Sequence, residues 1–264
     1  CSIAMQRISH CNPADNQLPC ESRFGGSHLL CIRTKHQRNT MILASQSPRR
    51  LELIASLGIT PQVIPADIDE SRKPNETPLA LVKRLAQEKA IAVCRHLMDN
   101  TQAVEKNNEI VIAADTIVWT EDGTVFGKPK DPEDAKRMLR ELSGKTHFVS
   151  TGVTLRRFKA FASPSPKGAP SVIAVSFVQT TEVTFYELSK DEIAAYVASG
   201  ETSDKAGAYG IQGRGRFLVQ EIKGDYENVV GLPVSLLARE LVKFTGSHNY
   251  LECALEGKSH QPAR

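Results

Sequence analysis

The stretch MILASQSPRRLELIASLG, residues 41–58, passes from a strand-like segment through a turn into a helix-like one. Met41 to Ala44 form the kind of apolar run that is typical of a buried strand. Pro48 lies where the first turn of a helix is expected, and Gly58 lies at the expected helix end. A buried strand followed directly by a helix is the first unit of an α/β pattern.

The same alternation continues to about residue 244. Strands are expected at 61–66, 109–119 (EIVIAADTIVW) and 216–222, and in two long β-rich segments, 146–158 and 172–188, that are expected to pair antiparallel. Helices are expected at 77–98, 131–144, 189–199 and 233–243. The connector at 159–171 is rich in Pro, Ser and Ala and is expected to be a surface loop. Residues 41–244 are therefore predicted to form one α/β domain with a mixed sheet.

The composition is that of an ordinary globular protein, with 264 residues, 41% hydrophobic content and a net charge of +3. No run approaches the roughly 20 apolar residues of a membrane span. Residues 1–40 account for the whole charge excess, and residues 41–264 are balanced. The balanced body, with its single Trp119, shows no interleaving of basic and aromatic residues. These features argue against binding to nucleic acids or membranes.

The two ends of the chain differ from the body. Four cysteines lie in residues 1–40, whereas Cys94 and Cys253 are alone in the remainder, so a reducing compartment is expected. Residues 1–40 are interpreted as an N-terminal extension that is disordered or targeting. Their acid-poor composition suits an organelle transit peptide, but they lack clear amphipathic periodicity. A cytoplasmic location is therefore the main expectation, and residues 245–264 are expected to be a C-terminal tail with little pattern.

The turn SQSPRR, residues 45–50, combines several groups that bind anions. A strand that ends at Ser45 and enters a helix at Pro48 presents backbone N–H groups, hydroxyls and the positive end of the helix dipole at one point. Arg49 and Arg50 add planar guanidinium groups that can grip phosphate oxygens in pairs. Ser-Pro before exposed arginines is also typical of a solvated, capped helix. The motif alone leaves both interpretations open.

Asp115 interrupts the apolar run IVIAADTIVW. Because the run is apolar on both sides, an ionised carboxylate there is costly unless it is paired, binds a metal or lies at the strand's end. This favours a chemical role over a structural one, in which Asp115 would accept backbone hydrogen bonds. Glu70, Lys89 and Lys128 each fit a surface charge when taken alone. With the arginine pair, however, they supply the carboxylates and cations of a magnesium-dependent phosphate site.

Several motifs resemble, in order and approximate spacing, the Maf family of nucleoside triphosphate pyrophosphatases: LASQSPRRLELIASLGI, DIDES, RLAQEKA, AADTIV, GKP, LSGKTH, STGV, DKAGAYGIQG and NVVGLP. The resemblance covers residues 41–244. It implies an α/β fold similar to that of inosine triphosphate pyrophosphatases, with an elongated mixed β-sheet flanked by helices and a cleft between two lobes. It also implies hydrolysis of a nucleoside triphosphate to monophosphate and pyrophosphate with a divalent metal, Mg²⁺ or else Mn²⁺, in an enzyme that is often a homodimer.

Three positions resemble the family branch that prefers dTTP and UTP to 7-methyl-GTP: Arg49, Thr116 and Gln212. The other branch has a Trp before the arginine pair, Asp-Gln in place of Asp-Thr, and Ser-Glu-Gly in place of Ile-Gln-Gly. The amide of Gln212 offers both a donor and an acceptor, which suits the O4 and N3–H edge of thymine or uracil. Pyrimidine nucleotides modified elsewhere on the base are an alternative substrate.

The resemblance implies a role for each site residue. Asp115 matches the general base proposed for the family and also contacts the metal, and Glu70 matches a metal-binding acid. The expected substrate-binding residues are Ser45, Arg49, Arg50, Lys89, Thr116, Lys128, Lys205 and Gln212. The cations among them are expected to neutralise the charge that shifts to pyrophosphate when water attacks the α-phosphorus.

A second class of function stays open. The family has also been linked to septum formation and division arrest, so a nucleotide-sensing regulator with little turnover is an alternative. The presence of Asp115 together with Glu70 and Lys89 argues against a protein that binds its nucleotide without hydrolysing it.

Overall fold

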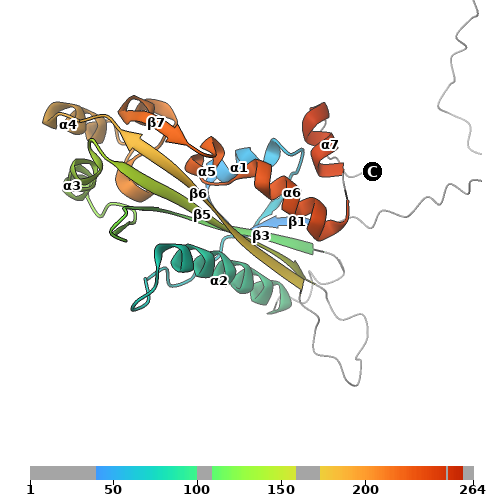
Figure 1. The fold of residues 1–264 in the computed structure, drawn as a ribbon. Helices are drawn as coiled ribbons and strands as arrows, with labels where there is room; N and C mark the ends of the chain where they lie inside the picture. Colours follow the sequence, from blue (N-terminus) through green and yellow to red (C-terminus); the bar gives the residue numbers. More distant parts are fainter. Residues whose placement is uncertain (1–39, 100–108, 159–172, 248, 258–264) are drawn as a thin grey trace, which may run out of the picture. The chain divides into compact units, whose positions relative to one another are not determined.

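Strand β3, Glu109–Trp119, lies inside a mixed seven-stranded sheet (Figure 1). The computed structural model describes residues 40–99, 109–158, 173–247 and 249–257. The strand order is β2-β1-β3-β5-β6-β7, with the short β4 paired to β3. β1 is parallel to β2 and β3, and the remaining pairs are antiparallel. The other strands are β1 (Met41–Leu43), β2 (Gln62–Val63), β4 (Val125–Phe126), β5 (Thr146–Phe158), β6 (Ile173–Phe185) and β7 (Val219–Lys223).

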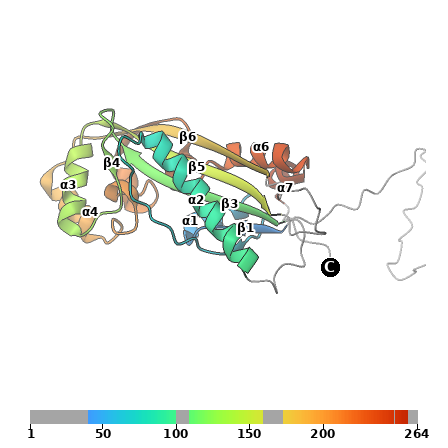
Figure 2. The same cartoon turned by 90° about the horizontal axis from the view of Figure 1, so that it is seen from below.

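Helices cover both faces of this sheet. In Figure 1, α2 lies on one face of β3 and β5, and α1, α5 and α6 lie on the other. Figure 2 shows α2 running along the strands, with α3 and α4 beside each other at one end. The helices are α1 (Pro48–Ala55), α2 (Pro78–Asp99), α3 (Pro132–Leu142), α4 (Lys190–Ala198), the 3₁₀ helices η2 (Ala206–Ala208) and η3 (Gly213–Leu218), α5 (Tyr226–Val230), α6 (Val234–Thr245) and α7 (Asn249–Glu256). The mixed α/β class and the antiparallel pairing of β5 with β6 are confirmed.

β3 is apolar along its length because alternate side chains enter two different cores. Ile110, Ile112 and Ala114 pack with residues of α1 and α6. Val111 and Ala113 pack against α2 on the other face. A strand covered by helices on both sides needs apolar residues at consecutive positions, and this explains the unbroken run before Asp115.

Gly152 on β5 lets α2 approach the sheet closely. It pairs in register with Asp115, and a Cβ atom on it would lie 2.4 Å from the carbonyl oxygen of Val82 on α2. Because no side chain fits in that space, the approach requires glycine. Lys89 lies two turns further along α2, so the close contact brings its side chain to the strand that carries Asp115.

Two segments differ from the sequence-based expectation. Residues 216–218, predicted to begin a strand, belong to η3, because β6 ends at Phe185, which pairs with Val219. Residues 216–218 lie beyond this pair, where β6 has ended, so they have no strand of the sheet to pair with. The segment after Phe244, predicted to be a tail, contains α7, whose Tyr250 is buried in the core formed with α6.

Other predictions fall outside the described residues. These are the surface loop at 159–171 and the N-terminal extension, of which only Thr40 is described. No helix in the described ranges is both long enough and apolar enough to cross a membrane.

His147 on β5 is fully buried in the core between the sheet and helices α3 and α4. Its Nε2 atom lies 2.8 Å from the hydroxyl of Tyr209, and its ring meets that of Phe185 edge-on at 4.8 Å. Burial lowers the pKa of His147 from 6.5 to about 4. The imidazole is therefore neutral in the folded protein near pH 7.

We expect the free energy of unfolding to fall as the pH drops below about 6.5, because the unfolded chain protonates His147 before the folded protein does. With a folded pKa of about 4, His147 should account for a loss of about 2 kcal/mol between pH 7 and pH 5. Urea unfolding at pH 7 and at pH 5 measures the free energy of unfolding. The His147→Gln variant should lose less of this free energy between the two pH values than the wild type does. Tyr209→Phe keeps the imidazole and should keep the pH dependence. Equal pH dependence in wild type and His147→Gln would contradict the prediction.

Candidate functional site

One edge of β3 is open where the site lies. β1 ends opposite Ile112, and β4 pairs only with Val118 and Trp119. Among the described residues, no strand lies beside this edge between those contacts, and a cavity of about 790 Å³ occupies the place. Asp115 and Thr116 point to opposite faces of the sheet. Both line the cavity because the edge between the two faces is uncovered.

All the residues predicted for the site line this one cavity. They are Ser45, Arg49 and Arg50 from the β1–α1 turn, Glu70 from the loop before α2, Lys89 from α2, Asp115 and Thr116 from β3, Lys128 from the segment after β4, and Lys205 and Gln212 from the segment around η2. The fold thus gathers residues from most of the length of the domain.

The β1–α1 turn takes the form expected of a capped helix start. The hydroxyl of Ser47, the N-cap residue, accepts a hydrogen bond from the backbone N–H of Arg50 at 3.4 Å. The hydroxyl of Ser45 accepts one from the backbone N–H of Ser47 at 3.2 Å. These bonds fix the turn, so that the helix start and both arginines border the cavity. The positive end of the helix dipole favours an anion there.

Arg50 is held in one place by three hydrogen bonds. Its guanidinium donates to the carbonyl of Gly231 at 2.9 Å, the hydroxyl of Ser45 at 3.2 Å and the hydroxyl of Thr116 at 2.9 Å. Gly231 has a φ of 134°, which L side chains rarely adopt, so this carbonyl position requires glycine. Burial lowers the pKa of Arg50, yet an arginine remains protonated in proteins. Arg50 is therefore a fixed cation with further N–H donors for a ligand.

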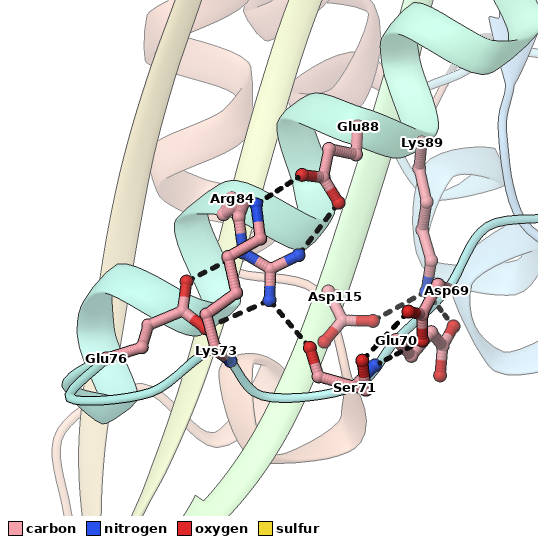
Figure 3. A network of polar contacts seen from close by, with 9 residues as sticks. All are labelled: Asp69, Glu70, Ser71, Lys73, Glu76, Arg84, Glu88, Lys89 and Asp115. Atoms are coloured by element: carbon pink, nitrogen blue, oxygen red, sulfur yellow. Dashed lines mark hydrogen bonds and ion pairs between the residues drawn. The ribbon is translucent and has the colours of Figure 1, made fainter.

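Lys89 links two carboxylates in the cavity wall (Figure 3). Its ammonium donates to Oδ1 of Asp115 at 2.6 Å and pairs with Oε1 of Glu70 at 2.6 Å. The side chains of Lys89 and Asp115 are each 11% exposed, whereas that of Glu70 is 56% exposed. One lysine thus bridges a buried carboxylate and an exposed one.

The pKa values of the two carboxylates shift in opposite directions. Burial raises the pKa of Asp115, and the positive charges of Lys89 and Arg50 offset this only in part. Partial burial also acts to raise the pKa of Glu70, but the hydrogen bond and charge of Lys89, together with the charges of Lys128 and Arg50, outweigh it and lower the pKa. Carboxylates with diverging pKa values suit different roles: one can accept a proton while the other stays ionised.

Asp204 is a site residue that sequence analysis did not single out. It lines the cavity and pairs with Arg49 at 2.9 Å and with Lys205 at 2.5 Å. Because its side chain is 56% exposed, solvent screens both pairs and a ligand can replace it at low cost. Its position beside Lys205 in the DKAGAYG motif is the signal that could have found it. Lys128 and Gln212 line the same cavity as exposed residues.

Glu70 and Asp115 are the residues best placed to hold a metal ion, because both contact the same cation, the ammonium of Lys89. Within the described ranges, no group of three or more His, Cys, Asp or Glu side chains could hold a metal. Mg²⁺ usually binds through one or two carboxylates, with substrate phosphates and waters completing its shell. The pair therefore fits a magnesium ion that binds together with a phosphorylated ligand.

Fold and site together define an α/β protein with a cleft suited to a phosphorylated ligand, since cations and a carboxylate pair line the same cavity. The chain belongs to the Maf family: the family model described as Maf-like protein matches residues 40–244. This confirms the resemblance that the sequence motifs indicated.

Relatives from bacilli match this chain over nearly their full length. A Bacillus cereus (strain AH820) protein named dTTP/UTP pyrophosphatase is 45% identical over 204 residues, which are 77% of this chain and 95% of that protein. A Bacillus cytotoxicus protein of the same name is 44% identical over 203 residues, covering 77% and 94%. The solved structure of the Staphylococcus aureus Ham1 protein is 15% identical, with a TM-score of 0.34, and covers 83% of this chain and 99% of its own.

We expect Lys89→Met to raise the pKa of Asp115 further. The variant loses the cation that favours the ionised carboxylate and leaves the negative charge of Glu70 nearby. An NMR titration of the Asp115 carboxyl carbon in metal-free protein measures the change. Arg49→Met is the matched control, because Arg49 pairs with Asp204 and its loss should leave the pKa of Asp115 where it was. An unchanged pKa in Lys89→Met would rule out Lys89 as the controlling partner.

Proposed function

We propose that this protein hydrolyses nucleoside triphosphates, dTTP and UTP in particular, to the nucleoside monophosphate and pyrophosphate. The observation that carries the proposal is the position of Asp115. It is a buried carboxylate with a raised pKa, held by Lys89 in a cavity that the arginine pair also lines. The relatives named dTTP/UTP pyrophosphatase support the same reaction.

In this proposal Asp115 is the general base. Burial raises its pKa, and a carboxylate with a raised pKa is a stronger proton acceptor than an ordinary one. The 2.6 Å bond from Lys89 fixes its orientation. The attacking water gives its proton to Asp115 while its oxygen bonds to the α-phosphorus. The bond from the α-phosphorus to the bridging oxygen breaks, and pyrophosphate leaves.

The cations of the cavity stabilise the leaving group. Negative charge moves onto pyrophosphate as the bridging bond breaks, and positive groups already in position need no reorganisation to stabilise it. Arg50 is the best fixed of them, through Gly231, Ser45 and Thr116. The other groups assigned to the phosphates are Arg49, Lys128, Lys205 and the hydroxyl of Ser45.

Glu70 and Asp115 would hold the divalent metal, Mg²⁺ or Mn²⁺. The metal supplies further neutralisation of the phosphate oxygens when bound. The lowered pKa of Glu70 keeps this residue ionised and ready to bind a cation over a wide pH range.

Gln212 is assigned to base recognition, together with Thr116 and Arg49 as positions that separate the two branches of the family. Thr116 acts through Arg50, to which it is hydrogen-bonded. Pyrimidine nucleotides with a modified base belong to the same proposed substrate class. The homodimer and the cytoplasmic location stay predictions.

The proposal is tested by release of pyrophosphate and monophosphate from dTTP, UTP, CTP, 7-methyl-GTP, ATP and GTP with Mg²⁺. We expect turnover of dTTP and UTP above the others, and a fall in kcat of about a hundredfold or more in Asp115→Asn, because the amide cannot accept the proton. A preference for 7-methyl-GTP would overturn the roles of Arg49, Thr116 and Gln212. Binding without turnover of any nucleotide would favour the nucleotide-sensing regulator.

Gln212→Glu should weaken the preference for dTTP and UTP over the other bases by about tenfold, because a carboxylate cannot donate to the base edge. The ratio of kcat/KM values for UTP and CTP measures this. Gln62→Glu is the matched control: Gln62 is an exposed glutamine on β2 that does not line the cavity of about 790 Å³. An unchanged ratio in Gln212→Glu would remove Gln212 from base recognition.

A further inference from the structure

Glu70 lies on a segment that has no regular structure to hold it. Residues 64–77, between β2 and α2, contain no helix or strand. Such a segment keeps one conformation only if side-chain contacts offset the entropy lost by ordering it. Glu70 itself supplies the 2.6 Å pair with Lys89, and its side chain is otherwise 56% exposed. Ile68, two residues before it, packs against the core residues Leu81 and Leu85 of α2. The position of Glu70 must therefore depend on other residues of the segment.

Arg84 on α2 makes three hydrogen bonds with this segment (Figure 3). Its guanidinium donates two hydrogen bonds to the carboxylate of Glu76, at 2.7 and 2.9 Å, and one to the backbone carbonyl of Ser71 at 2.9 Å. A fourth bond, to Glu88 on the same helix at 2.8 Å, fixes the guanidinium on α2. One side chain thus attaches the segment to the helix at two points, directly after Glu70 and at Glu76.

The backbone next to Glu70 is held from the other side as well. Asp69 accepts hydrogen bonds from the backbone N–H and the hydroxyl of Ser71, both at 2.9 Å. Ser71 therefore has its N–H held by Asp69 and its carbonyl held by Arg84. Glu70 lies between Asp69 and Ser71, so it is part of a local turn that Arg84 attaches to α2 at the carbonyl of Ser71.

The Arg84–Glu76 contact differs from an ordinary surface ion pair. It is bidentate, and the side chains are only 15% and 9% exposed. The Arg84 bond lowers the pKa of Glu76 to about 2 even though desolvation opposes the shift. Planar two-bond pairing of this kind adds geometric precision that a lysine cannot supply.

We propose that Arg84 is a positioning residue for metal binding: through Glu76 and the carbonyl of Ser71 it holds Glu70 at the Lys89–Asp115 pair and thereby sets the affinity for the divalent cation. Arg84 and Lys89 lie on the same helix, so α2 carries both the lysine that Glu70 contacts and the arginine that holds the Glu70 segment. The inference rests on the proposed role of Glu70 as a metal ligand. Residues that orient metal ligands affect metal affinity by about tenfold or more.

Arg137 on α3 provides a matched control. It also makes a forked set of hydrogen bonds, to Asp134 and Glu141, at 2.7 to 3.0 Å. Both partners lie on α3 itself, so Arg137 holds no loop, and it does not line the cavity. Replacing it removes a comparable number of charge-assisted bonds without touching the Glu70 segment.

The test measures Mn²⁺ binding to the full chain by electron paramagnetic resonance in the presence of saturating α,β-imido-dUTP, a non-hydrolysable analogue that supplies the phosphate ligands. It separately measures the Mg²⁺ concentration for half-maximal turnover of dTTP. Arg84→Gln should raise both half-saturating concentrations by about tenfold or more, with kcat at saturating Mg²⁺ within about twofold of wild type. Glu76→Gln removes the ion pair but leaves the bond from Arg84 to the carbonyl of Ser71, so it should lose less affinity than Arg84→Gln. The double variant should lose no more than Arg84→Gln alone, because Arg84→Gln already removes the contact with Glu76. Arg84→Lys keeps the charge but not the two-bond pairing with Glu76. Its half-saturating metal concentrations should lie between those of the wild type and those of Arg84→Gln. Circular dichroism establishes that each variant is folded.

Several results would overturn the proposal: Arg84→Gln with wild-type metal affinity, Arg137→Gln with an equal loss, or Arg84→Gln with kcat lost at every Mg²⁺ concentration. Glu70→Gln separates this proposal from the one it rests on. If Glu70→Gln loses Mn²⁺ and Arg84→Gln does not, the positioning role fails and the metal role of Glu70 stands. If neither variant loses Mn²⁺, both fail. If the wild type hydrolyses no nucleotide, the proposed function fails, and Mn²⁺ binding still decides the role of Arg84.

Discussion

The ion pair between Lys89 and Asp115 is the interaction on which the rest of this site depends. Asp115 lies in a strand buried on both faces, where an ionised carboxylate is costly without a partner. The 2.6 Å contact requires α2 to approach the sheet closely, which Gly152 permits. Because buried ion pairs often add little net stability, we interpret this one as the cost of placing a reactive carboxylate in a cavity.

The other charged groups of the site differ in what holds their side chains in position. Asp115 lies on the long strand β3 and Lys89 on the 22-residue helix α2, so backbone hydrogen bonds keep both backbones in place, and the 2.6 Å contact fixes the two side chains. Arg50 lies at a helix start but has a long side chain, and three hydrogen bonds fix its end. Glu70 lies outside any helix or strand, and its exposed side chain has one pair, with Lys89, while Arg84 bonds to the segment beside it. Functional groups need this second layer of support where the backbone supplies none.

The sequence was informative wherever one local signal dominated. Three local signals predicted positions that the structure confirms. The cap and proline predicted the start of α1, the apolar run predicted β3, and Asp115 lies on that strand at the cavity. In each case the burial and the backbone chemistry act over a few residues. Residues 216–218 and 249–256 were misjudged for the opposite reason. A strand at 216–218 would have needed a partner beyond the end of β6, and α7 is a helix of only two turns whose Tyr250 packs in the core.

The sequence by itself determined the family and the α/β alternation, since motif order and hydrophobic pattern are properties of the chain. It also predicted a set of site residues that line one cavity in the structure. The tertiary structure alone decided that one edge of β3 is open, that Lys89 bridges Asp115 and Glu70, and that Arg84 contacts the segment that carries Glu70. These features depend on distances between residues far apart in the chain. Such distances are set by how the helices pack on the sheet, and they cannot be predicted from a local sequence pattern.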